Sequence, residues 1–457
     1  MDTKLKAEQW LYVLFAASLP FATLFQLSVF DKTVQLSDLL FLASAIVWVF
    51  SLLTKRKDFV WSWFYVFLAA YALSTILSTL TSINPSQSSV KLVGKFYLIG
   101  IAFLTVNILT SGGVLKRLLQ GWIFGAGLAL TLSLLGIVLF YAGFNDPSQN
   151  PVVHPVFGSL PSGNYPRIEG FFLYPAMFCN YLSVSWMFAL LLVSAGWLKT
   201  RNFWIFSVAL FVVDAFTLTP GLGGIFLVAG YFFGRKLEKA QKPALGRLVF
   251  ATGVLAASAF LFAAAFTVFT FSKDGIRIPL ANGEIAASHR AVAWSGAFET
   301  FLQNPGFGYG IDMPVTKSEF TGPFGNRHTL TDAHNTYLSV LGETGLVGFV
   351  AFLNIICFIT MSLMRWDAKT EFHKTIRICL LLALLDAFFY QSLTGSYEDA
   401  RHLWILFGMI AAVCKIYAEP IDGRTVTEVA GGYQSVSVPP AVAGGTDITQ
   451  KYSAPYR

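Results

Sequence analysis

Apolar runs dominate this 457-residue sequence, and their length constrains the fold more than any other feature. A helix that crosses the hydrocarbon core of a bilayer needs about 20 apolar residues. Only 12% of the residues are charged and 55% are hydrophobic, which excludes a soluble enzyme, a secreted disulfide scaffold and a disordered chain. We predict an all-α polytopic membrane protein with about 12 spans, near 10–30, 36–54, 59–81, 89–110, 118–143, 170–198, 203–219, 221–234, 247–272, 334–364, 376–394 and 402–418.

Three of these runs need a further choice. The seventh and eighth are short and are separated by Thr219-Pro220-Gly221-Leu222-Gly223-Gly224, so they form two spans or a broken hairpin that meets a cavity. The first run follows a basic N-terminus, as a signal peptide does. It is long and has no small-x-small cleavage site, so we expect an uncleaved first span.

Basic residues predict the orientation of these spans. The connections that follow the even-numbered spans carry most of the lysines and arginines, and the short odd ones are nearly free of them. Such residues favour the cytoplasmic side of a membrane. We therefore interpret the net charge of +7 as an orientation signal, not as a nucleic-acid surface, and expect both termini inside.

This orientation divides the chain into four parts. They are spans one to nine over 1–272, a long outward loop over 273–333, spans ten to twelve over 334–418, and an inward tail over 419–457 that we expect to be disordered. Two shorter regions, 144–169 and 394–401, also face outward.

The outward loop 273–333 is the main anomaly, because long loops between spans tend to carry function. It contains Arg290, Trp294 and Arg327. Residues 286–302 have helical apolar spacing, which predicts an amphipathic helix at the outer surface. The alternative is a surface-packing helix whose Arg290 binds lipid phosphate.

His334 stands at the outer mouth of the tenth span and is suited to accept a proton from a hydroxyl. The alternative is a histidine at the lipid interface. Gly342, Gly345 and Gly348 follow at every third position, and small residues at this spacing let a neighbouring helix approach closely. We therefore expect a buried tenth span whose imidazole points into protein.

Three further cations lie near the same predicted face. Arg167 precedes the sixth span, and Lys91 and Lys95 lie one helical turn apart on the fourth. Cations there suit a lipid-linked pyrophosphate, although either lysine could instead extend to the headgroups. Asp214, Glu343 and Asp386 lie within spans, need partners or water, and keep a transporter in consideration.

Several of these residues together resemble the superfamily of O-antigen ligases and Wzy-type polysaccharide polymerases. The main signature is His334-Asn335, nine residues, and then Gly345-Leu346-Val347-Gly348. Arg290 with Trp294 and Asn304-Pro305-Gly306-Phe307-Gly308 resembles the arginine helix and Asn-Pro-x-x-Gly stretch of that family. Arg167-Ile168-Glu169-Gly170 and Glu398-Asp399-Ala400-Arg401-His402-Leu403-Trp404 also agree.

The resemblance implies a GT-C-type, metal-independent glycosyltransferase without a cofactor. Such enzymes transfer a glycan from undecaprenyl pyrophosphate to a hydroxyl at the periplasmic face of the inner membrane. The acceptor is lipid A-core for a ligase or another lipid-linked glycan for a polymerase. His334 would be the general base, Arg290 would bind the pyrophosphate, and Arg167 would position a substrate. Lys91, Lys95, Arg327 and Asn335 are further candidates for substrate binding.

One departure favours a polymerase of exopolysaccharide or O-antigen repeats over a ligase. Ligases of this family show a Ser-Arg pair where this chain has Leu218-Thr219-Pro220-Gly221, so Lys95 or Arg327 would have to supply the missing cation. A lipid-glycan flippase and a scaffold in an export complex are the alternatives from other classes. A chain-length regulator or export complex is a possible further partner.

Overall fold

The structure is a computed structural model and describes residues 4–24, 26–29, 32–146, 148–154, 164–219, 222–238, 278–280, 283–285, 290–321, 327–393 and 395–417. All of them belong to one compact unit over 2–418. The predicted ninth span at 247–272 and the predicted disordered tail at 419–457 lie outside the described residues.

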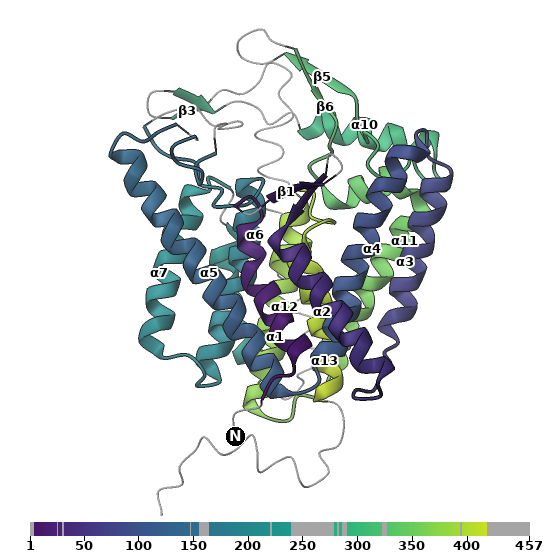
Figure 1. Cartoon of the computed structure of the whole chain (residues 1–457). Coiled ribbons are helices and arrows are strands. Elements are labelled where there is room, and N and C mark those ends of the chain that lie inside the picture. Colours follow the sequence, from purple (N-terminus) through teal and green to yellow (C-terminus); the bar gives the residue numbers. More distant parts are fainter. Residues whose placement is uncertain are drawn as a thin grey trace, which may run out of the picture. The chain divides into compact units, whose positions relative to one another are not determined.

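Helices account for most of the described chain, as expected from the apolar runs (Figure 1). They are α1 (Ala7–Ser18), α2 (Leu36–Leu53), α3 (Phe64–Leu80), α4 (Pro85–Ile108), α5 (Gly112–Tyr141), α6 (Pro175–Ser194), α7 (Thr200–Phe216), α8 (Leu222–Glu238), α10 (Arg290–Gln303), α11 (Thr336–Arg365), α12 (Glu371–Leu384) and α13 (Arg401–Ile416). Three short turns complete them, η1 (Leu19–Phe21), the π-helical η2 (Leu385–Tyr390) and η3 (Gln391–Leu393).

The predicted spans and the helices largely coincide. Within the described part of the chain, six helices are long and apolar enough to cross a membrane, namely α2, α4, α5, α6, α11 and the continuous run from α12 to η3. The remaining predicted spans in the described chain correspond to the shorter helices α1, α3, α7, α8 and α13. A multi-pass membrane protein is therefore supported, and the number of twelve spans stays a prediction.

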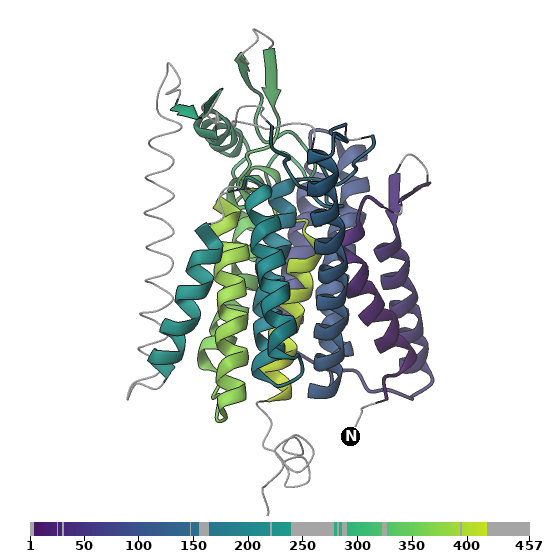
Figure 2. The same cartoon turned by 90° about the vertical axis from the view of Figure 1, so that its left-hand side faces the viewer.

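Three short antiparallel ribbons were not anticipated by the all-α prediction. They pair β1 (Gln26–Val29) with β2 (Lys32–Gln35), β3 (Ile278–Leu280) with β4 (Gly283–Ile285), and β5 (Ser318–Thr321) with β6 (Arg327–Leu330). The ribbons and α10 gather at one end of the long helices in both views (Figures 1 and 2). We call this end the ribbon end. Helix α10 overlaps the amphipathic helix predicted over 286–302.

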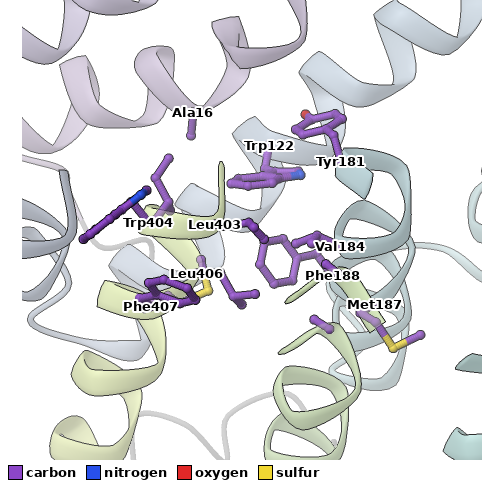
Figure 3. Close-up of a cluster of buried hydrophobic side chains, with 14 of the residues drawn as sticks. Ala16, Trp122, Tyr181, Val184, Met187, Phe188, Leu403, Trp404, Leu406 and Phe407 are labelled. Atoms are coloured by element: carbon purple, nitrogen blue, oxygen red, sulfur yellow. The ribbon is translucent and has the colours of Figure 1, made fainter. Parts of the chain in front are cut away.

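Buried apolar side chains from most of the helices form the core, and Figure 3 shows the part of it contributed by α1, α5, α6 and α13. Trp122 of α5 stacks on Tyr181 of α6, with ring centroids 5.2 Å apart, and meets the edge of Phe188. The indole N–H of Trp122 donates to Ser185 Oγ at 2.8 Å. Lipid tails are as apolar as these side chains, so close packing stabilises this core more than removal from water does.

Helix α11 is broken at Gly345, where the backbone takes φ 62° and ψ −165°. Loop 304–310, which follows α10, fills the break. Its carbonyls at Pro305 and Gly306 accept the N–H groups of Leu346 (2.8 Å) and Val347 (3.2 Å). In return Tyr309 and Gly310 donate to the carbonyls of Gly342 (2.9 Å) and Glu343 (3.0 Å). The loop thus bonds the backbone groups that the break releases, as burial requires.

The sequence predicted that a neighbouring helix packs closely against the glycines of α11, and the structure shows other neighbours. At Gly345 the neighbour is loop 304–310, not a helix, and an added Cβ would lie 2.5 Å from the carbonyl carbon and oxygen of Gly306. Gly342 faces Val315 and α10, while Gly348 faces Thr344 of its own helix. Small residues were correctly expected where backbones meet, but at Gly345 the partner is a loop.

We expect Gly345→Ala and Gly308→Ala to destabilise the protein by at least about 2 kcal/mol each. Both glycines have positive φ, and at Gly308 an added Cβ would collide with the Glu343 carbonyl. Thermal unfolding of the detergent-solubilised protein measures the effect. The control is Gly127→Ala in α5, where a Cβ meets nothing within 4 Å, and it should be neutral or stabilising. Equal stability of Gly345→Ala and the control would contradict this account of the break.

Candidate functional site

Several of the predicted site residues gather around a short connection between η3 and α13, which we call link 395–399. Its first residue bonds to the start of α11, where the Gly395 carbonyl accepts both the backbone N–H (3.0 Å) and the hydroxyl (2.9 Å) of Thr336. The Thr336 hydroxyl oxygen in turn accepts the N–H of Tyr397 at 2.8 Å. The link is thereby fixed to the first turn of α11, at the ribbon end.

His334 directly precedes α11 and has a left-handed backbone, with φ 48°. Residues other than glycine rarely adopt this conformation. Asp332 holds it, since one carboxylate oxygen accepts the His334 backbone N–H at 3.1 Å and the other lies 3.1 Å from Nδ1. The His334 side chain is half exposed, at 50%. A proton on Nδ1 facing the carboxylate leaves Nε2 as the nitrogen that can accept another.

The Asp332 carboxylate is held in turn by two hydroxyls. Ser396 of the link donates to it at 2.7 Å, and Ser339 of α11 donates at 3.3 Å. Burial raises the pKa of this carboxyl, but the hydrogen bonds and charge of His334 and the bond from Ser396 outweigh burial and lower it to about 2. Asp332 therefore stays ionised at neutral pH and can orient the imidazole and stabilise its protonated form.

Asn335, which the sequence predicted to bind substrate, uses its side chain to cap α11. Its side-chain oxygen accepts the N–H groups of Tyr337 (3.0 Å) and Leu338 (3.2 Å), which caps α11. Its amide nitrogen donates to the Leu393 carbonyl at 3.4 Å, and the residue is buried. The amide is thus occupied by contacts within the protein.

Arg290 begins α10 and lies near Tyr397 of the link. Burial lowers the pKa of the Arg290 guanidinium, and Tyr397 partly offsets that effect. The buried Tyr397 hydroxyl donates to the Ala176 carbonyl at 3.2 Å, at the start of α6. Tyr397 therefore joins the link to the ribbon end of α6 and lies near enough to Arg290 to act on its charge.

Arg167 lies at the ribbon end of α7. Its Nε is 3.5 Å from the Thr217 carbonyl, and the neighbouring Ile168 N–H donates to Phe216 O at 2.8 Å. Burial lowers the pKa of Arg167, and the charge of Glu169 opposes that effect. Glu169 is itself 2.5 Å from His154 Nδ1. An isolated antiparallel β-bridge between Val153 and Ile168 thus holds the segment that presents a partly buried guanidinium shortly before α6.

Lys91 and Lys95 share one carboxylate, that of Asp399. Each ammonium nitrogen lies 2.7 Å from an oxygen of Asp399. Lys95 is fully buried and is also 3.8 Å from Glu343, whereas Lys91 is partly exposed and 3.7 Å from Asp312. Burial acts to raise the pKa of the Asp399 carboxyl, but the two ammonium groups hold it well below its usual range. Both predicted phosphate ligands are thus ion-paired within the protein.

The segment that carries Arg290 and His334 also carries a family signature. Over residues 180–353 the chain matches the family model described as O-antigen ligase. This match confirms the resemblance to the superfamily of O-antigen ligases and Wzy-type polymerases, and it supports glycan transfer in a membrane. No curated protein matches the chain.

Several residues of the site were not identified from the sequence. Link 395–399 lies beyond the O-antigen ligase match. The sequence marked it as an outward region and included Glu398 and Asp399 in the resemblance, but gave neither acid a role. Two adjacent acids, Glu398 and Asp399, between apolar runs were a usable signal, because acids beside a bilayer need partners. Asp332 stands two residues before His334, a spacing that could have identified it. Arg327 begins β6, where it pairs with Thr321.

The acids predicted to lie within spans have polar neighbours. Asp386, in the π-helical turn η2, accepts from the Gln391 amide at 2.9 Å. Glu343 accepts the Asp312 N–H at 3.2 Å in addition to its contact with Lys95. These partners reduce the cost of burying Asp386 and Glu343, whereas the buried Asp214 Oδ1 has no hydrogen-bond partner among the described residues.

Glu398 is buried, and its pKa is raised to about 8. Burial is the largest cause. Lys95 opposes the shift, and the charges of Asp399, Glu343 and Asp332 add to it. The folded protein therefore favours neutral Glu398, whereas the unfolded chain ionises it near the ordinary value of 4.5. Between these two pH values the folded state binds more protons, so the free energy of unfolding falls as pH rises.

Glu398→Gln should remove this dependence, because glutamine is neutral at every pH. We expect the variant to unfold at nearly the wild-type temperature at pH 5 and at a higher temperature than wild type at pH 8.5. Thermal unfolding in detergent across this range is the measurement, and Glu299→Gln on the exposed face of α10 is the control. Parallel curves for wild type and Glu398→Gln would show that the buried carboxyl is not the titrating group.

Proposed function

We propose that this protein is a glycosyltransferase of the inner membrane that moves a glycan from undecaprenyl pyrophosphate to an acceptor hydroxyl at the periplasmic face. The observation that carries the proposal is the His334–Asp332 pair at the mouth of α11, within a segment similar to O-antigen ligases. An imidazole oriented by a carboxylate is a general base of the kind that a hydroxyl nucleophile needs.

In this mechanism the acceptor hydroxyl gives its proton to His334 Nε2, and its oxygen forms a bond to the anomeric carbon. The bond from that carbon to the pyrophosphate oxygen breaks, and its electron pair leaves with lipid pyrophosphate. Attack from the opposite face inverts the anomeric centre. The donor is already activated, so orientation of two substrates and neutralisation of the departing charge supply the catalysis.

Arg290 and Arg167 are the proposed ligands of the pyrophosphate. Both guanidinium groups are partly buried at the ribbon end, where their attraction for phosphate is stronger than in bulk water. Arg327 on β6 is a further candidate on the same side. Lys91 and Lys95 are assigned here to holding link 395–399, because both are already paired with Asp399.

The ribbon end is proposed to be periplasmic. Basic residues follow the opposite ends of the helices, for instance Lys57 after α2, Lys116 in the first turn of α5, and Arg365 at the end of α11. The positive-inside rule places those ends in the cytoplasm. His334, Arg290 and Arg167 then face the periplasm, and both termini are cytoplasmic.

Polymerisation of exopolysaccharide or O-antigen repeats is proposed ahead of ligation to lipid A-core. Helix α7 ends at Phe216, and Leu218 and Thr219 follow where the resemblance predicts Ser-Arg for a ligase. A flippase is the competing class and would be expected to carry charges near the middle of the bilayer and two similar halves. The cations proposed for substrate lie at one end of the helices instead.

His334→Ala should lower glycan transfer by at least about 100-fold, because a general base contributes roughly that much or more. The assay uses purified protein, a glycan on undecaprenyl pyrophosphate and an acceptor, with product followed by chromatography. His373→Ala, on α12 at the opposite end, is the control and should keep wild-type turnover. Near-normal turnover of His334→Ala would remove His334 from the mechanism.

The glycan profile of a deletion strain separates the three functions. Loss of a polymerase accumulates single repeats on the lipid carrier, and this is the result we expect. Accumulation of unattached polymer would instead identify a ligase, and accumulation of donor that faces the cytoplasm would identify a flippase. Complementation with wild type, but not with His334→Ala, should restore the normal profile.

A further inference from the structure

Link 395–399 connects the two halves of the proposed chemistry. Ser396 donates to Asp332, which orients His334, and Tyr397 is near enough to Arg290 to affect the pKa of its guanidinium. Both neighbours come from segments distant in sequence. A shift of the link would therefore move Ser396 and Tyr397 together.

The far end of the link is fixed by charge. The Asp399 carboxylate bridges Lys91 and Lys95 of α4, each at 2.7 Å, and Lys95 is fully buried. Just beyond it, Arg401 lies 2.9 Å from Asp38 of α2. The backbone carbonyl of Glu398 also accepts the indole N–H of Trp404 at 2.8 Å. Ionic contacts to two helices thus hold the last residues of the link.

The strength of this attachment follows from burial. A buried ammonium group is costly unless a carboxylate lies beside it, and removal of one partner leaves the other uncompensated. Apart from Asp399, the nearest carboxylate to Lys95 is that of Glu343 at 3.8 Å. Lys95 therefore draws Asp399, and the backbone that carries it, into one position.

From these contacts we infer that Asp399 is a positioning residue for the transfer reaction. Its bridge to Lys91 and Lys95 fixes link 395–399, so that Ser396 sets the Asp332–His334 pair. Asp399 does not touch the reacting atoms in this arrangement. The inference rests on the proposed function for its catalytic consequence, but the placement of the link can be tested without it.

The single variant Asp399→Asn leaves the Lys95 charge exposed to a low dielectric and is expected to lower stability. The informative variant is therefore Asp399→Asn combined with Lys95→Gln, in which both charges of the buried pair are removed. We expect it to unfold near the wild-type temperature. Hydrogen exchange followed by mass spectrometry should nevertheless show faster exchange in residues 332–336 and 395–399, because the link is no longer pinned.

Its turnover number should fall on the order of 10- to 100-fold, since small displacements of a catalytic group have effects of this size. KM for the donor should change less. Asp399→Glu keeps the charge and should restore part of the turnover. The control is Asp312→Asn, which removes a carboxylate from the same cluster but not from the link, and it should keep wild-type turnover and exchange.

The outcomes separate this inference from the proposed function. Recovery of both stability and turnover in the double variant would show that Asp399 is merely structural and overturn the inference. Unchanged exchange in residues 332–336 would overturn it as well. Transfer by wild type that persists in His334→Ala would overturn the mechanism instead. A wild-type protein without transfer, whose double variant still exchanges faster in both segments, would overturn the function and leave the placement of the link intact.

Discussion

The break in α11 is the constraint on which the proposed site depends. A helix inside a membrane cannot leave backbone N–H and C=O groups unpaired, so a break must be bonded by another segment. Loop 304–310 supplies four such bonds at Gly345 and continues directly from α10. The helix that carries Arg290 is therefore tied by backbone hydrogen bonds to the helix that begins after His334.

A second network, made of side-chain contacts, joins α4 to the segment that precedes α11. The Asp399 bridge to α4 holds link 395–399, and the link reaches Asp332 through Ser396. Buried ion pairs of this kind contribute more to a defined arrangement than to net stability, because desolvation offsets their attraction. The backbone network places the segments, and the ionic network places the side chains between them.

Part of the site could be predicted from the sequence because its residues stand in local patterns. His334 at the mouth of a span and Arg290 at the start of an amphipathic segment are visible without a structure. The contacts of Lys95 and Asn335 could not be predicted, since a lysine near a membrane face and an asparagine beside a histidine suit several roles. Only their neighbours, Asp399 for Lys95 and the N–H groups of α11 for Asn335, show what each side chain contacts.

From the sequence alone we could predict a multi-pass membrane protein, most helix positions and the end of the helices at which the candidate cations gather. These follow from apolar run length and charge placement, which act locally. The tertiary structure alone decided that Asp399 lies between Lys91 and Lys95, that Ser396 reaches Asp332, and that a loop enters α11. Such contacts join residues up to 308 positions apart, and a single sequence carries no local signal for distances through space.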